Sequence, residues 1–193
     1  RDNYPKCVLD SLMNILGTHD TSRILTVLGG VPAYNKDEMN VTVMSEEVKV
    51  KAKVLLKIAA VLQYTLFGVP CIYYGDEIGM EGYGDPFCRH TFSWDKIDND
   101  LLGYYKRLGN MRRHLTLFRD SEYRELYADE KCLVYERAAG DQQVIVAINL
   151  GNNLFDIKFN GKLFDLFDND VFEGKFTILP QSCTILSNIR LNI

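Results

Sequence analysis

The chain has 193 residues, of which 47% are hydrophobic and 25% charged, with a formal net charge of −4. This is an ordinary globular balance, and it argues against a nucleic-acid partner, which requires a basic face. No apolar run reaches the roughly 18 residues of a membrane span, so a membrane is not expected as a partner either.

The first predicted elements are a strand and a long helix. Residues 12–16 form a short apolar run that is typical of a strand buried on both faces. Residues 45–67 are predicted to be helical, because the segment starts with Ser-Glu-Glu and stops at Gly68, two residues before a proline. The stripe predicted to face inward recurs at three-to-four spacing: Val54, Ile58, Val61, Leu62 and Thr65.

A second strand, a loop and a second helix follow. Residues 69–75 are rich in β-formers, residues 76–100 are polar, and residues 101–115 repeat apolar side chains with helical spacing. The order strand, helix, strand, loop, helix predicts parallel strands joined by helical crossovers.

The composition changes near residue 120. From residue 122 onward, short alternating runs are separated by turns that contain Gly or Asn, which predicts five to seven antiparallel strands in a small β-sandwich. We therefore expect two domains: an α/β portion over residues 1–119 and an antiparallel β-sandwich over residues 120–193.

The five cysteines are widely spaced and odd in number, and none has metal-ligand spacing. Free thiols in a reducing cytoplasm are the favoured interpretation, and a disulfide framework is the alternative. The chain opens with Arg-Asp-Asn-Tyr, without an initiator Met or a signal peptide, which predicts a piece of a longer cytoplasmic protein.

The first candidate site is the pair His19-Asp20, just after the first strand. Ligands of parallel α/β folds bind at the carboxyl ends of the strands, and an adjacent imidazole and carboxylate both hydrogen bond to polyhydroxylated ligands. The alternative is that Asp20 and Thr21 only cap a short helix over residues 21–30.

Asp76 and Glu77 follow the second strand, and the favoured interpretation is structural, as caps of backbone amides or partners of an arginine. The loop over residues 81–94 mixes Gly, Pro, acidic, basic and aromatic residues in a manner suited to sugar binding. Its Trp94 is interpreted as a packing anchor rather than a stacking platform.

Two long motifs, LMNILGTHDTSRILT at 12–26 and GVPCIYYGDEIGMEGYGDPFCRHTFSWD at 68–95, resemble the α-amylase family of glycoside hydrolases. The closest likeness is to the neopullulanase, cyclomaltodextrinase and maltogenic amylase group, and it extends to about residue 190. The resemblance implies strands seven and eight of a (β/α)8 TIM barrel, followed by the antiparallel β-domain.

The resemblance also implies roles for single residues. Asp20 would be the third catalytic carboxylate, a stabiliser of the transition state, and His19 would bind the same sugar ring. Asp85 and Arg89, four apart in DPFCR, would hold the neighbouring glucose unit, and Arg23 would be structural. The implied partner is an α-glucan oligosaccharide; no cofactor or metal is implied for this chain, and a structural calcium in the rest of the protein stays open.

Retaining glycosidases also need a nucleophile and an acid/base, two carboxyl groups about 5–5.5 Å apart. The family takes them from strands four and five, and neither motif occurs in this sequence. We therefore expect a C-terminal fragment that is inactive alone and that needs the missing barrel portion or another copy of the chain to cover its strand edges.

Two alternatives belong to other classes of function. One is a non-catalytic amylase-like scaffold, as in amino-acid transporter heavy chains, and the other is a carbohydrate-binding β-domain. The retained HD and DPFCR motifs favour the enzyme, because a scaffold does not need residues that hold a sugar. The tail also lacks the paired tryptophans typical of starch-binding modules.

Overall fold

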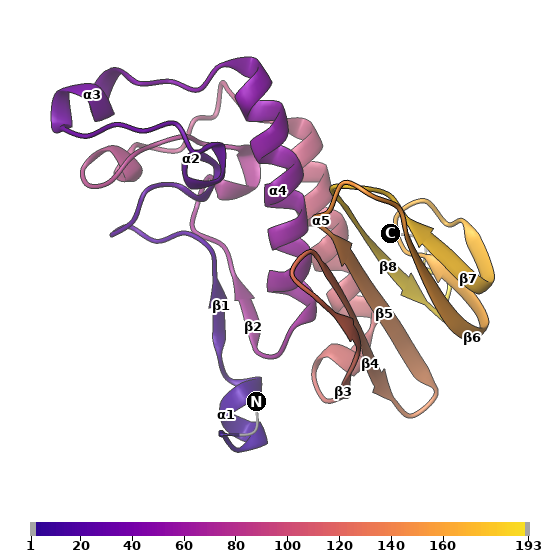
Figure 1. Ribbon diagram of the computed structural model, residues 1–193. Helices are drawn as coiled ribbons and strands as arrows, with labels where there is room; N and C mark the ends of the chain where they lie inside the picture. The colour runs from indigo at the N-terminus through magenta and orange to yellow at the C-terminus, as the bar shows by residue number, and fades with distance from the viewer. Residues whose placement is uncertain (1–2, 192–193) are drawn as a thin grey trace. The chain divides into compact units, whose positions relative to one another are not determined.

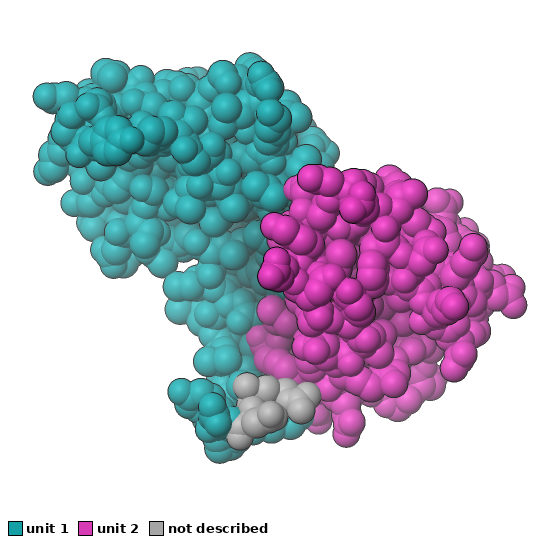
Figure 2. Space-filling view, viewed as in Figure 1, with its two compact units in different colours: residues 1–64, 68–106 teal, residues 65–67, 107–193 magenta. Residues whose placement is uncertain are grey.

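A computed structural model describes residues 3–191, which divide into two compact units. One unit contains the residues up to 64 together with 68–106, and the other contains 65–67 and the residues from 107 onward (Figure 2). The expected division into domains at residue 120 stays a prediction, because compactness alone assigns no domain.

The first unit is built on two parallel strands. β1 (Met13–Ile15) pairs with β2 (Val69–Cys71) in the register Met13 to Val69 and Ile15 to Cys71 (Figure 1). The chain between them forms three helices, α2 (Ile24–Gly29), α3 (Lys36–Val41) and α4 (Glu46–Thr65). A short helix, α1 (Lys6–Asp10), precedes β1. The predicted helical crossover between parallel strands is confirmed.

The burial of β1 differs from the expectation. Met13 is 64% exposed and Ile15 is 46% exposed, so the strand is not buried on both faces. Among the described residues β2 is the one strand paired with β1, and a strand with a single neighbour leaves side chains in solvent. β2 is also shorter than predicted, because its pairing with β1 ends at Ile15 and Cys71. The chain then turns at Gly75, which has φ 89°, into a 3-10 turn, η1 (Asp76–Ile78).

Helix α4 covers the predicted span, and its apolar face contributes to the core of the first unit. That core contains Leu25, Met44, Ala52, Leu56 and Leu101. Of the stripe predicted to face inward, Ile58, Val61 and Thr65 are buried, whereas Val54 is 38% exposed. Ala52, Leu56 and Ala60 are buried as well, so the buried face is centred to one side of Val54.

Gly68 ends the connection from α4 to β2. It has φ 88°, and a Cβ there would lie 2.3 Å from the carbonyl oxygen of Leu12. The backbone N–H of Val69 donates to that same oxygen at 2.7 Å. The close approach of the two chain segments therefore requires glycine.

Helix α5 (Asn99–His114) confirms the second predicted helix. The Asp98 carboxylate caps it by accepting hydrogen bonds from the backbone N–H groups of Asp100 and Leu101, each at 3.0 Å. The last turn carries two arginines and a histidine, and positive charge there stabilises the helix by interacting with the negative end of its dipole. Two further 3-10 turns are η2 (Phe87–Arg89) and η3 (Thr116–Phe118).

The second unit holds an antiparallel sheet of six strands in the order β3-β4-β5-β8-β6-β7. The strands are β3 (Glu122–Ala128), β4 (Cys132–Ala139), β5 (Gln142–Asn149), β6 (Phe155–Asp165), β7 (Val171–Ile178) and β8 (Ser182–Ser187). The antiparallel prediction is confirmed. Hydrogen bonds join all six strands into one sheet rather than two, because β6 pairs with β8 as well as with β7.

The hydrophobic core of the second unit contains residues from strands on both sides of the sheet order. Val134, Ile145 and Leu186 from β4, β5 and β8 belong to one buried cluster with Ile157 and Ile178 from β6 and β7. These positions alternate with more exposed residues along β6 and β7, as expected for strands with one solvated face. Within the described residues, no helix is both long and apolar enough to cross a membrane.

Candidate functional site

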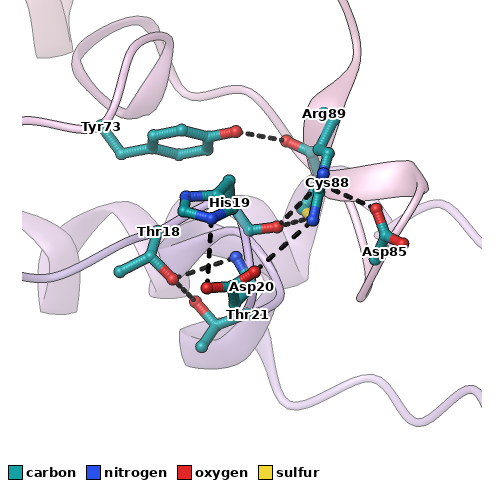
Figure 3. A network of polar contacts seen from close by, with 8 residues as sticks. All are labelled: Thr18, His19, Asp20, Thr21, Tyr73, Asp85, Cys88 and Arg89. Carbon is teal, nitrogen blue, oxygen red and sulfur yellow. Dashed lines mark hydrogen bonds and ion pairs between the residues drawn. The ribbon is translucent and has the colours of Figure 1, made fainter.

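The candidate site forms where the turn after β1 meets the segment after β2. Residues 18–21 follow the carboxyl end of β1, and residues 85–89 come from the loop after β2 (Figure 3). Helix α2 starts at Ile24 with Arg23 as its N-cap residue, and no side chain caps it. The alternative role of Asp20 and Thr21 as caps of this helix is therefore wrong.

The Asp20 carboxylate lies beside an imidazole and a guanidinium. His19 Nε2 lies 3.2 Å from Asp20 Oδ2, and Arg89 Nη2 lies 3.4 Å from Asp20 Oδ1. The side chains of His19 and Asp20 are 62% and 69% exposed, so these contacts add little to stability. The backbone instead holds the turn, because the N–H of Asp20 donates to Thr18 Oγ1 at 3.1 Å. The carboxylate thus stays accessible for a ligand.

Arg89 connects the two segments. Its Nε lies 2.8 Å from Asp85 Oδ1 and donates to the carbonyl oxygen of His19 at 3.1 Å. The Cys88 thiol lies 3.1 Å from the same carbonyl oxygen. The structure therefore brings His19, Asp20, Asp85 and Arg89, the four residues singled out in the sequence, into one cluster, which we call the rim cluster.

Two tyrosines support the rim cluster and were not identified from the sequence. The Tyr73 hydroxyl donates to the carbonyl oxygen of Cys88 at 3.4 Å, and the Tyr74 hydroxyl donates to that of His90 at 2.7 Å. Burial raises the pKa of the Tyr73 hydroxyl, so it remains a donor. The one available signal was the Tyr-Tyr pair that directly precedes Gly75 at the end of the second predicted strand.

A buried ion pair, Arg23–Asp76, lies next to the turn that carries Asp20. Arg23 is fully buried and Asp76 is 3% exposed; Arg23 Nη1 lies 3.4 Å from Asp76 Oδ1 and also donates to the carbonyl oxygen of Tyr74. Burial raises the pKa of Asp76 to about 6, although the Arg23 guanidinium acts in the opposite direction. A Cβ at Gly17 would lie 2.3 Å from Asp76 Oδ2, so this pair packs directly against the turn that carries Asp20.

The structural interpretation of Asp76 and Glu77 is confirmed. Asp76 pairs with Arg23, and Glu77 Oε2 accepts a hydrogen bond from the backbone N–H of Gly75 at 2.8 Å. Trp94 is 79% exposed and contacts Phe92 with 4.5 Å between the ring centroids, so its interpretation as a packing anchor is wrong for the described residues. In the part of the chain that the structure describes, no group of three or more His, Cys, Asp or Glu side chains is arranged to hold a metal ion.

Comparison with known proteins shows the same family as the two sequence motifs. The chain is 38% identical to amylopullulanase of Thermoanaerobacter thermohydrosulfuricus over 162 residues, which cover 78% of this chain and 11% of that protein. It is 37% identical to cyclomaltodextrinase of Geobacillus thermopakistaniensis over 159 residues, which cover 80% and 24%. The chain thus spans between about a tenth and a quarter of the length of these relatives.

The fold agrees with that of solved amylases. The crystal structure of an Anoxybacillus α-amylase superimposes with a TM-score of 0.75 over 95% of this chain and 39% of that one, at 19% identity. The family description "Alpha amylase, catalytic domain" matches residues 3–101, about half of the chain, including all of the rim cluster. The chain therefore belongs to the α-amylase family.

Proposed function

We propose that this chain is part of a retaining α-glucan hydrolase that cleaves α-1,4 or α-1,6 glucosidic bonds of maltodextrins, cyclodextrins or pullulan. The observation that carries the proposal is the rim cluster, in which an accessible carboxylate lies between an imidazole and a guanidinium at the carboxyl end of β1. Active sites of (β/α)8 barrels lie at that end of the strands. The names of the relatives, amylopullulanase and cyclomaltodextrinase, support the substrate class.

For the fold, we propose that residues 1–119 are the C-terminal portion of a (β/α)8 barrel with β1 and β2 as its strands seven and eight. The exposed apolar side chains of Met13, Ile15 and Val69 support this, because strands of a closed barrel are covered on both sides. The remaining barrel strands, or a second copy of the chain, would cover them. We propose that residues 120–193 fold as a β-sandwich, in which the two ends of the six-stranded sheet enclose the cluster that they share.

In this proposal the rim cluster binds two neighbouring glucose units. Asp20 accepts hydrogen bonds from the ring at the cleaved bond and stabilises the positive charge of the oxocarbenium-like transition state. His19 binds the same ring, while Asp85 and Arg89 bind the next one. The nucleophile and the acid/base come from barrel strands outside these 193 residues. The five cysteines are free, which supports a reducing compartment such as the cytoplasm.

Complementation tests this function. We expect the 193-residue chain to release no reducing sugar from maltotriose or cyclodextrin, because Asp20 alone supplies neither nucleophile nor proton donor. The same chain joined to six preceding barrel strands that carry both carboxylates should hydrolyse both substrates. Turnover by the 193 residues alone would contradict the proposed division of the catalytic groups, and a folded but inactive complete barrel would favour the scaffold alternative.

The role of Arg89 gives a further prediction. In the complete barrel, Arg89→Met should lower kcat/KM for maltotriose about tenfold, mainly through a higher KM, because a charge-assisted hydrogen bond to the bound sugar is lost. The melting temperature should change little, since the Arg89 side chain is 47% exposed. Steady-state kinetics with Arg113→Met, an exposed arginine near the end of α5, as the matched control will check this. An unchanged KM with a lowered kcat would contradict a binding role.

A further inference from the structure

A cavity lies in the first unit, and the residues of the rim cluster do not line it. Its volume is about 540 Å³, within the range of about 300–1,000 Å³ that is usual for small-molecule sites. Helices α3 and α4 and residues 78–98 line it. The two sites are nevertheless neighbours along the chain, because the cavity is lined by Phe87 and His90, on either side of Arg89.

Two lysines in the lining of the cavity form three ion pairs with carboxylates. Lys49 Nζ lies 2.8 Å from Glu81 Oε1 and 3.2 Å from Glu46 Oε1, and Lys53 pairs with Asp98. The hydrogen bond with Glu81 raises the pKa of Lys49 against the opposing effect of burial, so the Lys49 ammonium group is charged at neutral pH. The side chains of Lys49 and Glu81 are only 21% and 24% exposed. These charges are therefore held in fixed positions rather than spread over a mobile surface.

The equal numbers of lysines and carboxylates in the lining favour a neutral ligand over a charged one. Three lysines and three carboxylates line the cavity: Lys49, Lys53 and Lys96, and Glu46, Glu81 and Asp98. An anion would lie against the carboxylates and a cation against the lysines, so either is disfavoured. A neutral hydroxyl suits both, because it accepts from an ammonium group and donates to a carboxylate.

The cavity also offers apolar side chains that suit a sugar ring. Met39, Val43 and Phe87 line the same cavity and offer apolar surface for the CH face of a pyranose. We propose that this cavity is an accessory saccharide site that binds one or two glucosyl units of an α-glucan away from the rim cluster. The identity of the sugar rests on the proposed function, whereas the preference for a neutral polyhydroxylated ligand rests on the cavity itself.

Titration of the isotope-labelled 193-residue chain with maltotriose, followed by NMR, tests the proposal. We expect saturable shifts of backbone amides in residues 79–83 and 93–98. The double variant Lys49→Met/Glu81→Gln should bind there about tenfold more weakly, because the ammonium donor is lost and the carboxylate acceptor is replaced by a weaker, neutral amide oxygen. The matched control, Lys51→Met/Glu47→Gln, removes an exposed pair of the same helix at 2.8 Å that does not line the cavity, and it should bind as the unaltered chain does.

A second variant keeps the ion pairs intact. Val43→Arg places a long side chain at the cavity, and because Val43 is 69% exposed the substitution should not disturb folding. It too should weaken binding at residues 79–83 and 93–98. Failure of both variants to weaken these shifts, or saturable binding of inorganic phosphate at the same residues, would overturn the proposal. Shifts confined to residues 17–21 and 85–89 would overturn the accessory site and leave the proposed function standing.

Discussion

Replacing Asp20 with asparagine is expected to lower kcat for maltotriose by about 10²–10³-fold in the complete barrel, the usual effect of removing one preorganised group that stabilises charge in the transition state. Asparagine keeps the shape and the hydrogen-bonding reach of the side chain but loses the negative charge that opposes the developing oxocarbenium ion. KM should change much less than kcat, because the ground-state sugar is neutral and its hydroxyls still find a partner. Steady-state kinetics on maltotriose separates the two quantities.

Folding should not be affected by this substitution. The Asp20 side chain is 69% exposed, and the contact that fixes its turn, from its backbone N–H to Thr18 Oγ1, does not involve the carboxylate. Asp95→Asn, an exposed aspartate in the loop after β2, is the control and should keep full activity. A kcat within about threefold of the unaltered enzyme for Asp20→Asn would contradict the transition-state role.

Replacing Arg23 with methionine is expected to destabilise the first unit by about 3–5 kcal/mol at pH 7, the usual cost of breaking a buried ion pair from one side. Asp76 would remain 3% exposed without a countercharge, and the carbonyl of Tyr74 would lose its donor. The guanidinium also lies over two aromatic rings, 4.4 Å from the Tyr73 centroid and 4.6 Å from that of Tyr74, and these contacts would be lost. Urea unfolding measures the difference.

The protonation of Asp76 should make the free energy of unfolding depend on pH. Its pKa is raised by burial to about 6, above an unfolded value of about 3.9, so the folded chain binds this proton more tightly. The contribution of Asp76 to stability is therefore fully present below about pH 4 and is lost as the pH rises to about 6. The difference of about two units between the folded and unfolded pKa of Asp76 corresponds to about 3 kcal/mol of stability. In Arg23→Met the loss should extend to higher pH, because the remaining countercharge is gone.

Asp76→Asn provides the control for this prediction. The variant should lack the decrease in stability between about pH 4 and 6, and combining it with Arg23→Met should cost less than the sum of the two single changes, since no buried charge remains without a partner. Arg113→Met, on the exposed side of α5, should change stability by less than about 0.5 kcal/mol. Identical pH profiles for the unaltered chain and Asp76→Asn would contradict the assignment.

The family and the predicted element types followed from local patterns. The helix over residues 45–67 was found from its apolar periodicity, acidic first turn and glycine stop, and the helix over residues 101–115 from its apolar periodicity, because these signals act within a few turns of the chain. The antiparallel strands after residue 122 were found for the same reason, from alternation and turn residues. Burial of residues 12–16 was predicted wrongly, because it depends on how many strands lie beside them.

Within the candidate site, the sequence singled out His19 and Asp20 by their position after the first predicted strand, and Asp85 and Arg89 through the family resemblance of the motif that contains them. Only the tertiary structure decided that Arg89 contacts the turn of Asp20 across 69 positions and that Arg23 pairs with Asp76 across 53. Contacts between residues so far apart depend on the parallel register of β1 and β2, which brings their carboxyl ends together. Local sequence preferences set the elements, whereas packing between distant elements determines which charges meet, because burial and distance control their energies.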